Sequence, residues 1–236
     1  MSGERKSKLA IQYLEQDVVL NIGMIEPINR ETAELIYAEK DGVLLLEKKS
    51  GAYMMSVDEP GLAEKLVAGI RDAKLFAAHQ QFCLPIIESS FGLSPQFRCR
   101  PAAYFNKTLL PTDVSIKIDI LNSRHVQEVL EHYHTMDDAD YIRSLIDIGQ
   151  IYGTFVDGRL AGFIGIHLEG SIGMLEVMPE FRRRGIGHAL ESYIVNMMLE
   201  KGWTPFCEVF ENNLTSINLQ KKLGFAISDQ CLYWFF

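Results

Sequence analysis

The segment VMPEFRRRGIGHAL, residues 177–190, restricts the fold of this chain more than any other feature. An apolar run before it predicts a strand over 171–178, and periodic apolar residues after it predict a helix over 186–200. Backbone N–H groups at a helix start lack intrahelical partners and carry partial positive charge. Glycines let an anion approach such groups, and arginines add charge-assisted hydrogen bonds. The segment therefore predicts a strand–loop–helix unit that binds a diphosphate.

The composition is that of a globular protein with a substantial core. The chain has 236 residues, of which 47% are hydrophobic and 23% charged, so it is longer than one average domain. The net charge of −8 disfavours binding to a nucleic-acid backbone, and we expect no nucleic-acid partner. The four cysteines lack zinc or redox spacing, and we expect no metal. The N-terminal segment lacks the apolar stretch of a secretory signal, and no run has the length of a membrane span. We therefore expect a cytoplasmic protein without a membrane partner.

Turn residues and periodicity predict two α/β domains, 1–112 and 113–236, with the boundary in the turn-rich stretch NKTLLPTDVS at 106–115. The expected elements of the first domain are a helical region over 5–30, three short strands within 33–57, helices over 60–72 and 80–90, and strands over 74–79 and 96–105. The expected elements of the second are strands over 114–120, 150–156, 159–168, 171–178, 205–211 and 225–235, and helices over 123–135, 138–148, 186–200 and 214–223.

The two halves end in the same order of elements, helix–strand–helix–glycine–strand. ESSFGL (88–93) and QKKLGF (220–225) occupy equivalent places in this order. A duplication in which only the second copy keeps the arginine–glycine loop explains the correspondence, and chance similarity of two α+β domains also explains it. The sequence leaves both explanations open.

Two motifs resemble those of a known family. The loop spacing differs from the dinucleotide and ATPase fingerprints. It is similar to the Arg/Gln-x-x-Gly-x-Gly/Ala signature of the GNAT superfamily of acyl-CoA N-acyltransferases, matched by Arg182, Gly185 and Gly187. The later stretch ENNLTSINLQKKLGF (211–225) resembles the second motif of that family. The agreeing residues are Asn213, Ser216, Leu219, Gly224 and Phe225.

The resemblance covers residues 113–236 and implies a mixed, mostly antiparallel sheet with flanking helices, preceded by a smaller α/β domain that is a candidate degenerate copy. The segment GWTPFCEVFENN (202–213) also resembles the glycine N-acyltransferase-like branch. The implied activity is N-acetyltransfer, with acetyl-CoA or another acyl-CoA as cosubstrate and a primary amine of a small molecule or amino acid as acceptor. The implied cofactor-binding residues are Leu175, Glu176, Val177, Arg182, Arg183, Arg184, Gly185, Ile186, Gly187, His188, Asn213 and Gln220.

Four residues, two glutamates and two tyrosines, are candidates for proton transfer. Glu208 alternates with two phenylalanines on a strand, and an apolar environment raises the pKa of a carboxylate. Glu176 lies on the strand that would border the thioester. A structural role at a sheet end, with a backbone or arginine partner, is the alternative for each glutamate. Gln220 stands where the family usually has a tyrosine acid, so the thiolate leaves unaided, or another group such as Tyr233, Tyr193 or water assists it, or transfer is slow.

Two further functions remain open at this stage. Without a tyrosine at position 220 the protein is also compatible with a catalytically weak or inactive acyl-CoA sensor. A peptide or protein N-acetyltransferase would need an open acceptor groove. Either a monomer or a homodimer is expected.

Overall fold

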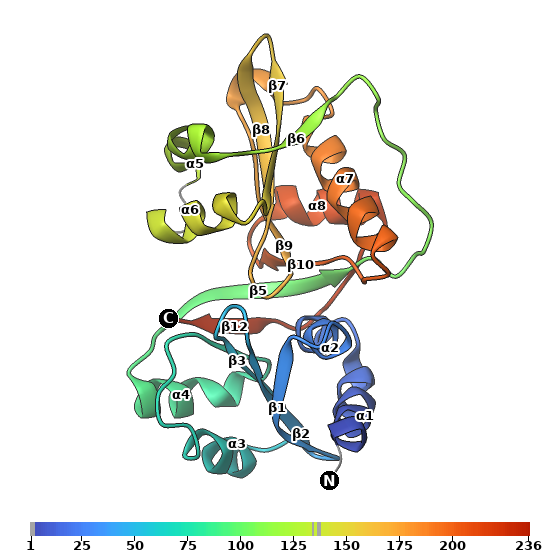
Figure 1. Cartoon of the computed structure of the whole chain (residues 1–236). Helices are drawn as coiled ribbons and strands as arrows, with labels where there is room; N and C mark the ends of the chain where they lie inside the picture. The colour runs from blue at the N-terminus through green and yellow to red at the C-terminus, as the bar shows by residue number, and fades with distance from the viewer. Residues whose placement is uncertain (1–2, 134, 136–137) are drawn as a thin grey trace. The chain divides into compact units, whose positions relative to one another are not determined.

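The computed structural model describes residues 3–133, 135 and 138–236 (Figure 1). Two compact units emerge from the contacts of the chain, one formed by residues up to Ala103 with Glu208–Phe236, the other by Tyr104–Cys207. Mixed, mostly antiparallel sheet and flanking helices make up both, which confirms the predicted fold class. The predicted boundary between domains 1–112 and 113–236 stays a prediction.

The first unit is a mixed sheet between two pairs of helices. Its strands are ordered β1-β2-β3-β4-β12-β5, and β11 pairs with β5. All neighbours are antiparallel except β3 and β4, which are parallel. The elements are α1 (Gly3–Leu14), η1 (Glu15–Asp17), α2 (Ile22–Asn29), β1 (Ala33–Glu39), β2 (Gly42–Glu47), β3 (Tyr53–Val57), α3 (Pro60–Val67), β4 (Phe76–Ala78), η2 (Gln81–Cys83), α4 (Leu84–Phe91), β5 (Pro95–Ala103), α8 (Leu214–Leu223), β11 (Ala226–Ile227) and β12 (Leu232–Phe235).

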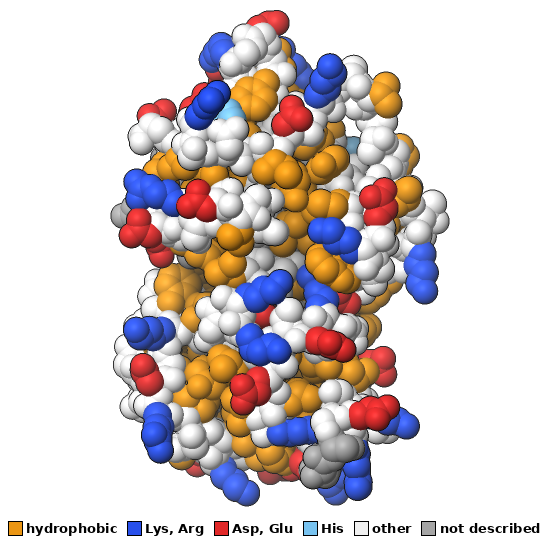
Figure 2. All heavy atoms as spheres, in the orientation of Figure 1, with side chains coloured by type: hydrophobic (Ala, Val, Ile, Leu, Met, Phe, Trp, Pro, Cys, Tyr) orange, Lys and Arg blue, Asp and Glu red, His pale blue; other side chains and the backbone are white. Residues whose placement is uncertain are grey.

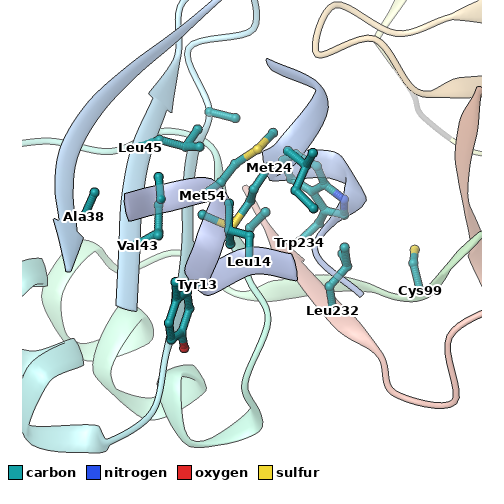
Figure 3. Packing of buried hydrophobic residues seen from close by; sticks show 14 residues of the cluster. Tyr13, Leu14, Met24, Ala38, Val43, Leu45, Met54, Cys99, Leu232 and Trp234 are labelled. Atoms are coloured by element: carbon teal, nitrogen blue, oxygen red, sulfur yellow. The ribbon is translucent and has the colours of Figure 1, made fainter. Parts of the chain in front are cut away.

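Strand alternation gives this unit two cores. Met54 of β3 and Trp234 of β12 pack with α1 and α2 in one cluster, shown in Figure 3. Their neighbours Met55 and Phe235 pack with α3 and α4 in the other. Successive side chains of a strand point to opposite faces, so a sheet covered by helices on both faces needs apolar residues at consecutive positions.

The second unit has strands in the order β10-β9-β8-β7-β6, antiparallel except for the parallel pair of β10 and β9. In Figure 1, α5 and α6 lie on one face of these strands and α7 on the other. The elements are β6 (Ile118–Ile120), η3 (Ser123–His125), α5 (Val126–His132), α6 (Ala139–Asp147), β7 (Ile151–Val156), β8 (Arg159–Ile166), β9 (Ile172–Val177), η4 (Pro179–Phe181), α7 (Ile186–Glu200) and the start of β10 (Phe206–Phe210).

Most predicted elements are present, and several differ in extent. The strand predicted over 114–120 is limited to β6, and the helix predicted over 123–135 consists of η3 and α5. The helix predicted over 60–72 ends at Val67, where the Gly69 and Ile70 N–H groups bond to carbonyls three residues back. The strand predicted over 225–235 is split into β11 and β12. A turn at Ser228 separates them, and Arg100 Nε donates to the Ser228 carbonyl at 2.7 Å.

Candidate functional site

A bulge in β9 opens one edge of the second unit's sheet. Between two regular pairs with β8, three steps on β9 (Gly173 to Glu176) face two steps on β8 (Phe163 to Gly165). Met174 lies within this stretch with φ of 56°, in the left-handed region that few non-glycine residues adopt. On its other side, as far as the described residues show, β9 pairs with β10 at Ile172 alone. The rest of β9 therefore presents an edge that is not part of that ladder.

Val177 directs its backbone polar groups toward this edge. The Met178 N–H donates to the Ala161 carbonyl on β8 at 3.1 Å, and N–H directions alternate along a strand. The Val177 N–H and C=O therefore point away from β8. Arg182 Nε donates to the Val177 carbonyl at 2.9 Å, which holds this guanidinium beside the open edge.

The loop after β9 presents a row of backbone donors. Arg183 and Gly185 have φ of 61° and 80°, and α7 begins at Ile186 with Gly185 as its N-cap. The first N–H bonded within the helix belongs to Ala189, which donates to the Gly185 carbonyl at 2.9 Å. In the part of the chain that the structure describes, the N–H groups from Arg183 to His188 donate to no protein acceptor. Such successive N–H groups at a helix start form an anion-binding concavity.

The surroundings of this loop fit a diphosphate. The side chains of Arg182, Arg183 and Arg184 are exposed, and Arg184 also lies over the Phe181 ring at 5.5 Å from its centre. A Cβ added at Gly187 would lie 3.6 Å from Val177 Cγ2, so the protein itself has room for a side chain there. The glycine instead keeps the space between α7 and the edge of β9 open.

A cleft of about 420 Å³ lies on the other face of β9, next to α5. Glu176 lies between Leu175 and Val177, whose side chains lie near Gly187 of α7, and strand alternation turns the Glu176 side chain away from α7 toward the cleft. The cleft is lined by Glu131, His132, Thr135, Glu176, Val177, Met178, Pro179 and Arg182.

Tyr133, which is buried, and Tyr141, which is half-buried, lie near one another next to the residues of this cleft. Tyr133 is 7% exposed, and its burial raises its pKa to about 12, with the charges of Glu176 and Glu169 adding to the effect. The Tyr141 hydroxyl lies 2.9 Å from His167 Nδ1, and the two rings stack. Burial also raises the pKa of Tyr141. Both phenols are therefore neutral donors at physiological pH.

The sequence analysis missed Glu131 and Tyr133 as site residues. Their positions depend on how α5 packs beside β9, and no sequence motif indicates this packing. The nearby His134 and Asp137 lie outside the described residues.

The structure brings together one group of predicted site residues in the second unit, namely Leu175, Glu176, Val177 and the loop from Arg182 to His188. The other predicted residues belong to the first unit, so the structure does not relate them to β9, and their site roles stay predictions.

These other residues have defined local roles. Glu208 accepts a hydrogen bond from Trp234 Nε1. Tyr233 is packed in a core cluster. Asn213 caps α8 by accepting from the Ser216 N–H at 3.0 Å, and Gln220 is 2% exposed on the same helix.

The corresponding edge in the first unit is closed. There β3 pairs with β4 at three successive positions from Tyr53 to Met55. The Val57 N–H donates to Gln80 Oε1 at 2.9 Å, and Gln80 Nε2 donates to Ser56 Oγ at 3.0 Å. The following helix α3 begins at Pro60, which has no N–H group. This edge therefore has neither an open strand nor a row of donors for an anion.

A family comparison agrees with this geometry. Residues 118–225 match the model of the acetyltransferase (GNAT) family. The matched segment is that of a GNAT acetyltransferase domain. The resemblance inferred from the two motifs is thereby confirmed at the level of the superfamily, and the glycine N-acyltransferase-like branch stays a prediction. No curated protein matches the sequence.

Solved structures show the same fold over nearly the whole chain. A Drosophila protein has a TM-score of 0.67 at 14% identity, with 100% of this chain and 96% of that one covered. A GNAT-family acetyltransferase from Colwellia psychrerythraea has a TM-score of 0.52 at 14% identity, covering 100% and 97%. A GCN5-related N-acetyltransferase-like protein from Streptococcus suis has a TM-score of 0.53 at 13% identity, covering 96% and 98%.

Two kinds of feature are absent from the described residues, a metal-binding cluster and a membrane-spanning helix. In residues 3–133, 135 and 138–236, no three His, Cys, Asp or Glu side chains are grouped to hold a metal ion. No described helix combines the length and apolar character needed to cross a membrane. On the face in Figure 2, acidic and basic side chains are interspersed.

Proposed function

We propose that this chain is an acyl-CoA N-acyltransferase that moves an acyl group, acetyl in the simplest case, to a primary amine of a small molecule or amino acid. The observation that carries the proposal is the set of backbone donors in the second unit. Six successive N–H groups, Arg183 to His188, lie beside the open edge at Val177. A diphosphate joined to an extended amide chain is the ligand that such an arrangement suits, and coenzyme A has this form.

The loop and the strand edge would bind different parts of the ligand. The loop N–H groups, with the guanidinium groups of Arg182, Arg183 and Arg184, would hold the diphosphate. The edge of β9 from Leu175 to Val177 would hydrogen-bond the amides of the pantetheine arm, as a strand edge binds an extended peptide.

Acetyl-CoA would supply an activated acyl group. The amine nitrogen would bond to the carbonyl carbon as the carbon–sulfur bond breaks, and the coenzyme would leave as a thiol. Glu176 faces the cleft and would accept a proton from the incoming ammonium. The Val177 N–H would donate to the carbonyl oxygen as negative charge develops there. A thiol has a pKa of about 8.5, so its departure does not require a strong acid. Gln220, in place of the usual tyrosine, is compatible with such a reaction.

The test is thiol release from acetyl-CoA with a panel of primary amines. Glu176→Gln should lower kcat by about 10²-fold or more, because a positioned base contributes that much, and should leave the Kd for acetyl-CoA within about twofold. Glu200→Gln, an exposed position at the end of α7, is the matched control and should behave as the unaltered protein. Binding of acetyl-CoA without transfer to any amine would reject the enzyme and leave an acyl-CoA sensor.

A further inference from the structure

The sheet of the second unit ends in a strand whose outer edge is complementary to itself. We propose that the chain forms a homodimer in which β6 pairs antiparallel with β6 of a second copy, about a two-fold axis at Ile118. Among the residues that the structure describes, β6 pairs with β7 on one side and has no strand on the other (Figure 1). This inference does not depend on the proposed function.

The backbone of β6 directs hydrogen-bonding groups outward at alternate residues. The Leu121 N–H donates to the Ile151 carbonyl on β7 at 2.8 Å, so the N–H and C=O groups of Ile120 and Ile118 point away from β7. Ile118 can therefore exchange two hydrogen bonds with Ile118 of a second copy. In the same register the Ile120 N–H faces the Ile116 carbonyl of the second copy, and the two-fold axis repeats that bond.

The side chains around this axis complement one another. Residues 116–120 read Ile-Lys-Ile-Asp-Ile, and both Lys117 and Asp119 are exposed. With Ile118 on the axis, Lys117 of each copy lies opposite Asp119 of the other, and isoleucines meet on the opposite face of the strands. A register centred on Asp119 would instead place two carboxylates opposite each other, which is unfavourable. The charges therefore favour one register and a second copy as the partner.

Apolar side chains at this edge are exposed in the single chain. Ile120 is 55% exposed although it belongs to a strand, and Ile148, which follows α6, is also 55% exposed. A Cβ added at Gly149 would lie 3.7 Å from Ile120 Cγ2, so both isoleucines belong to the same part of the surface. Pairing with a second copy would remove part of this apolar area from water and would give the outward backbone groups partners.

The outer strand of the first unit, β1, is protected against such pairing. It has a bulge between Leu35 and Tyr37. Lys6 Nζ donates to the carbonyls of Leu35 and Ile36, the second at 2.9 Å. Bulges and lysines at an edge prevent association between strands. The pairing of β6 with β7 is regular, and the lysine at the β6 edge has an aspartate of opposite charge two residues away, so this edge excludes foreign strands more than it excludes its own copy.

Charge reversal at the two exposed positions tests the pairing. Because small interfaces form weak complexes, the full chain is examined by sedimentation velocity at low ionic strength up to about 0.5 mM, and we expect a monomer–dimer equilibrium. Lys117→Asp and Asp119→Lys each replace two attractive pairs with two repulsive ones and should raise the Kd of the dimer about tenfold or more. The double variant restores pairs of opposite charge and should dimerise like the unaltered protein. Lys107→Asp makes the same charge change at an exposed position outside β6 and should leave the Kd unchanged.

An equimolar mixture of the two single variants gives the sharpest result. The aspartates of one variant would lie opposite the lysines of the other, so the mixture should form heterodimers at concentrations where each variant alone is a monomer. This outcome is a gain of association, which misfolding of a variant cannot produce. A monomer at every concentration of the unaltered protein would overturn the inference. Dimers of both single variants as tight as that of the unaltered protein would also overturn it, because the copies would then associate through another surface.

Discussion

Gly187 offers a test in which stability and ligand affinity should change in opposite directions. It is the second residue of α7 and has ordinary helical backbone angles, so alanine fits its conformation. The added Cβ would lie 3.6 Å from Val177 Cγ2 and 4.0 Å from Leu175 Cδ2, which is ordinary contact distance. Gly187→Ala therefore introduces no clash within the protein.

The expected magnitudes follow from this geometry. Alanine is favoured over glycine in a helix interior by about 1 kcal/mol, and less in a first turn, so the free energy of unfolding should rise by about 0.5–1 kcal/mol and Tm by about 2 °C. The same methyl group projects into the space between α7 and β9, where the ligand would pass. Lengthening one charge-assisted hydrogen bond costs about 1.5 kcal/mol, so the Kd for acetyl-CoA should rise about tenfold.

Thermal unfolding without ligand and isothermal calorimetry with acetyl-CoA measure the two effects. Gly158→Ala is the matched control, because Gly158 lies in the β7–β8 turn with φ of 76° and nothing near its Cβ. A left-handed alanine costs about 1 kcal/mol, so this variant should lose stability and bind acetyl-CoA normally. An unchanged Kd for Gly187→Ala would refute the placement of the ligand beside this helix.

Three other predictions concern the first unit. Trp234→Ala removes a core side chain and the donor to Glu208, so urea denaturation should show a loss of about 3–5 kcal/mol, and a loss under 1 kcal/mol would contradict this packing. Burial lowers the pKa of His79 to about 3, so the folded protein keeps it neutral while the unfolded chain binds a proton below about pH 6.5. Stability is thus full above that pH and should fall by about 2 kcal/mol between pH 7 and pH 5, a slope that His79→Gln should remove. Because Gln80 occupies the edge at Val57, calorimetry should find one acetyl-CoA per chain, and two would show that this edge opens.

The sequence alone did not predict which residues line the cleft. Glu176 was predicted to lie beside the thioester, because it belongs to the strand before the loop. In the structure it lines the cleft. Glu131 was not selected, because a glutamate on a short helix is normally a solvated surface charge. Only the docking of α5 beside β9 gives it a second carboxylate as a neighbour.

The sequence by itself determined the features that depend on neighbouring residues. α7 and α8 have the predicted bounds, and Gly224 ends α8 in the left-handed conformation, because helix periodicity and capping involve residues at most four positions apart. The loop donors at Arg183–His188 follow from the same local rules.

Tertiary structure alone decided the partners of the strands. The sequence predicted a strand over 225–235 without its partners, and the structure pairs β12 with β4 and β5 and places Trp234 and Phe235 in the two cores of the first unit. The sequence of an apolar strand does not specify which distant strand it will pair with, because its pattern determines only which faces are buried. The closed edge at Val57 and the open edge at Val177 likewise lie at the ends of strands of similar composition. They differ because of the residues from elsewhere in the chain that pack against them.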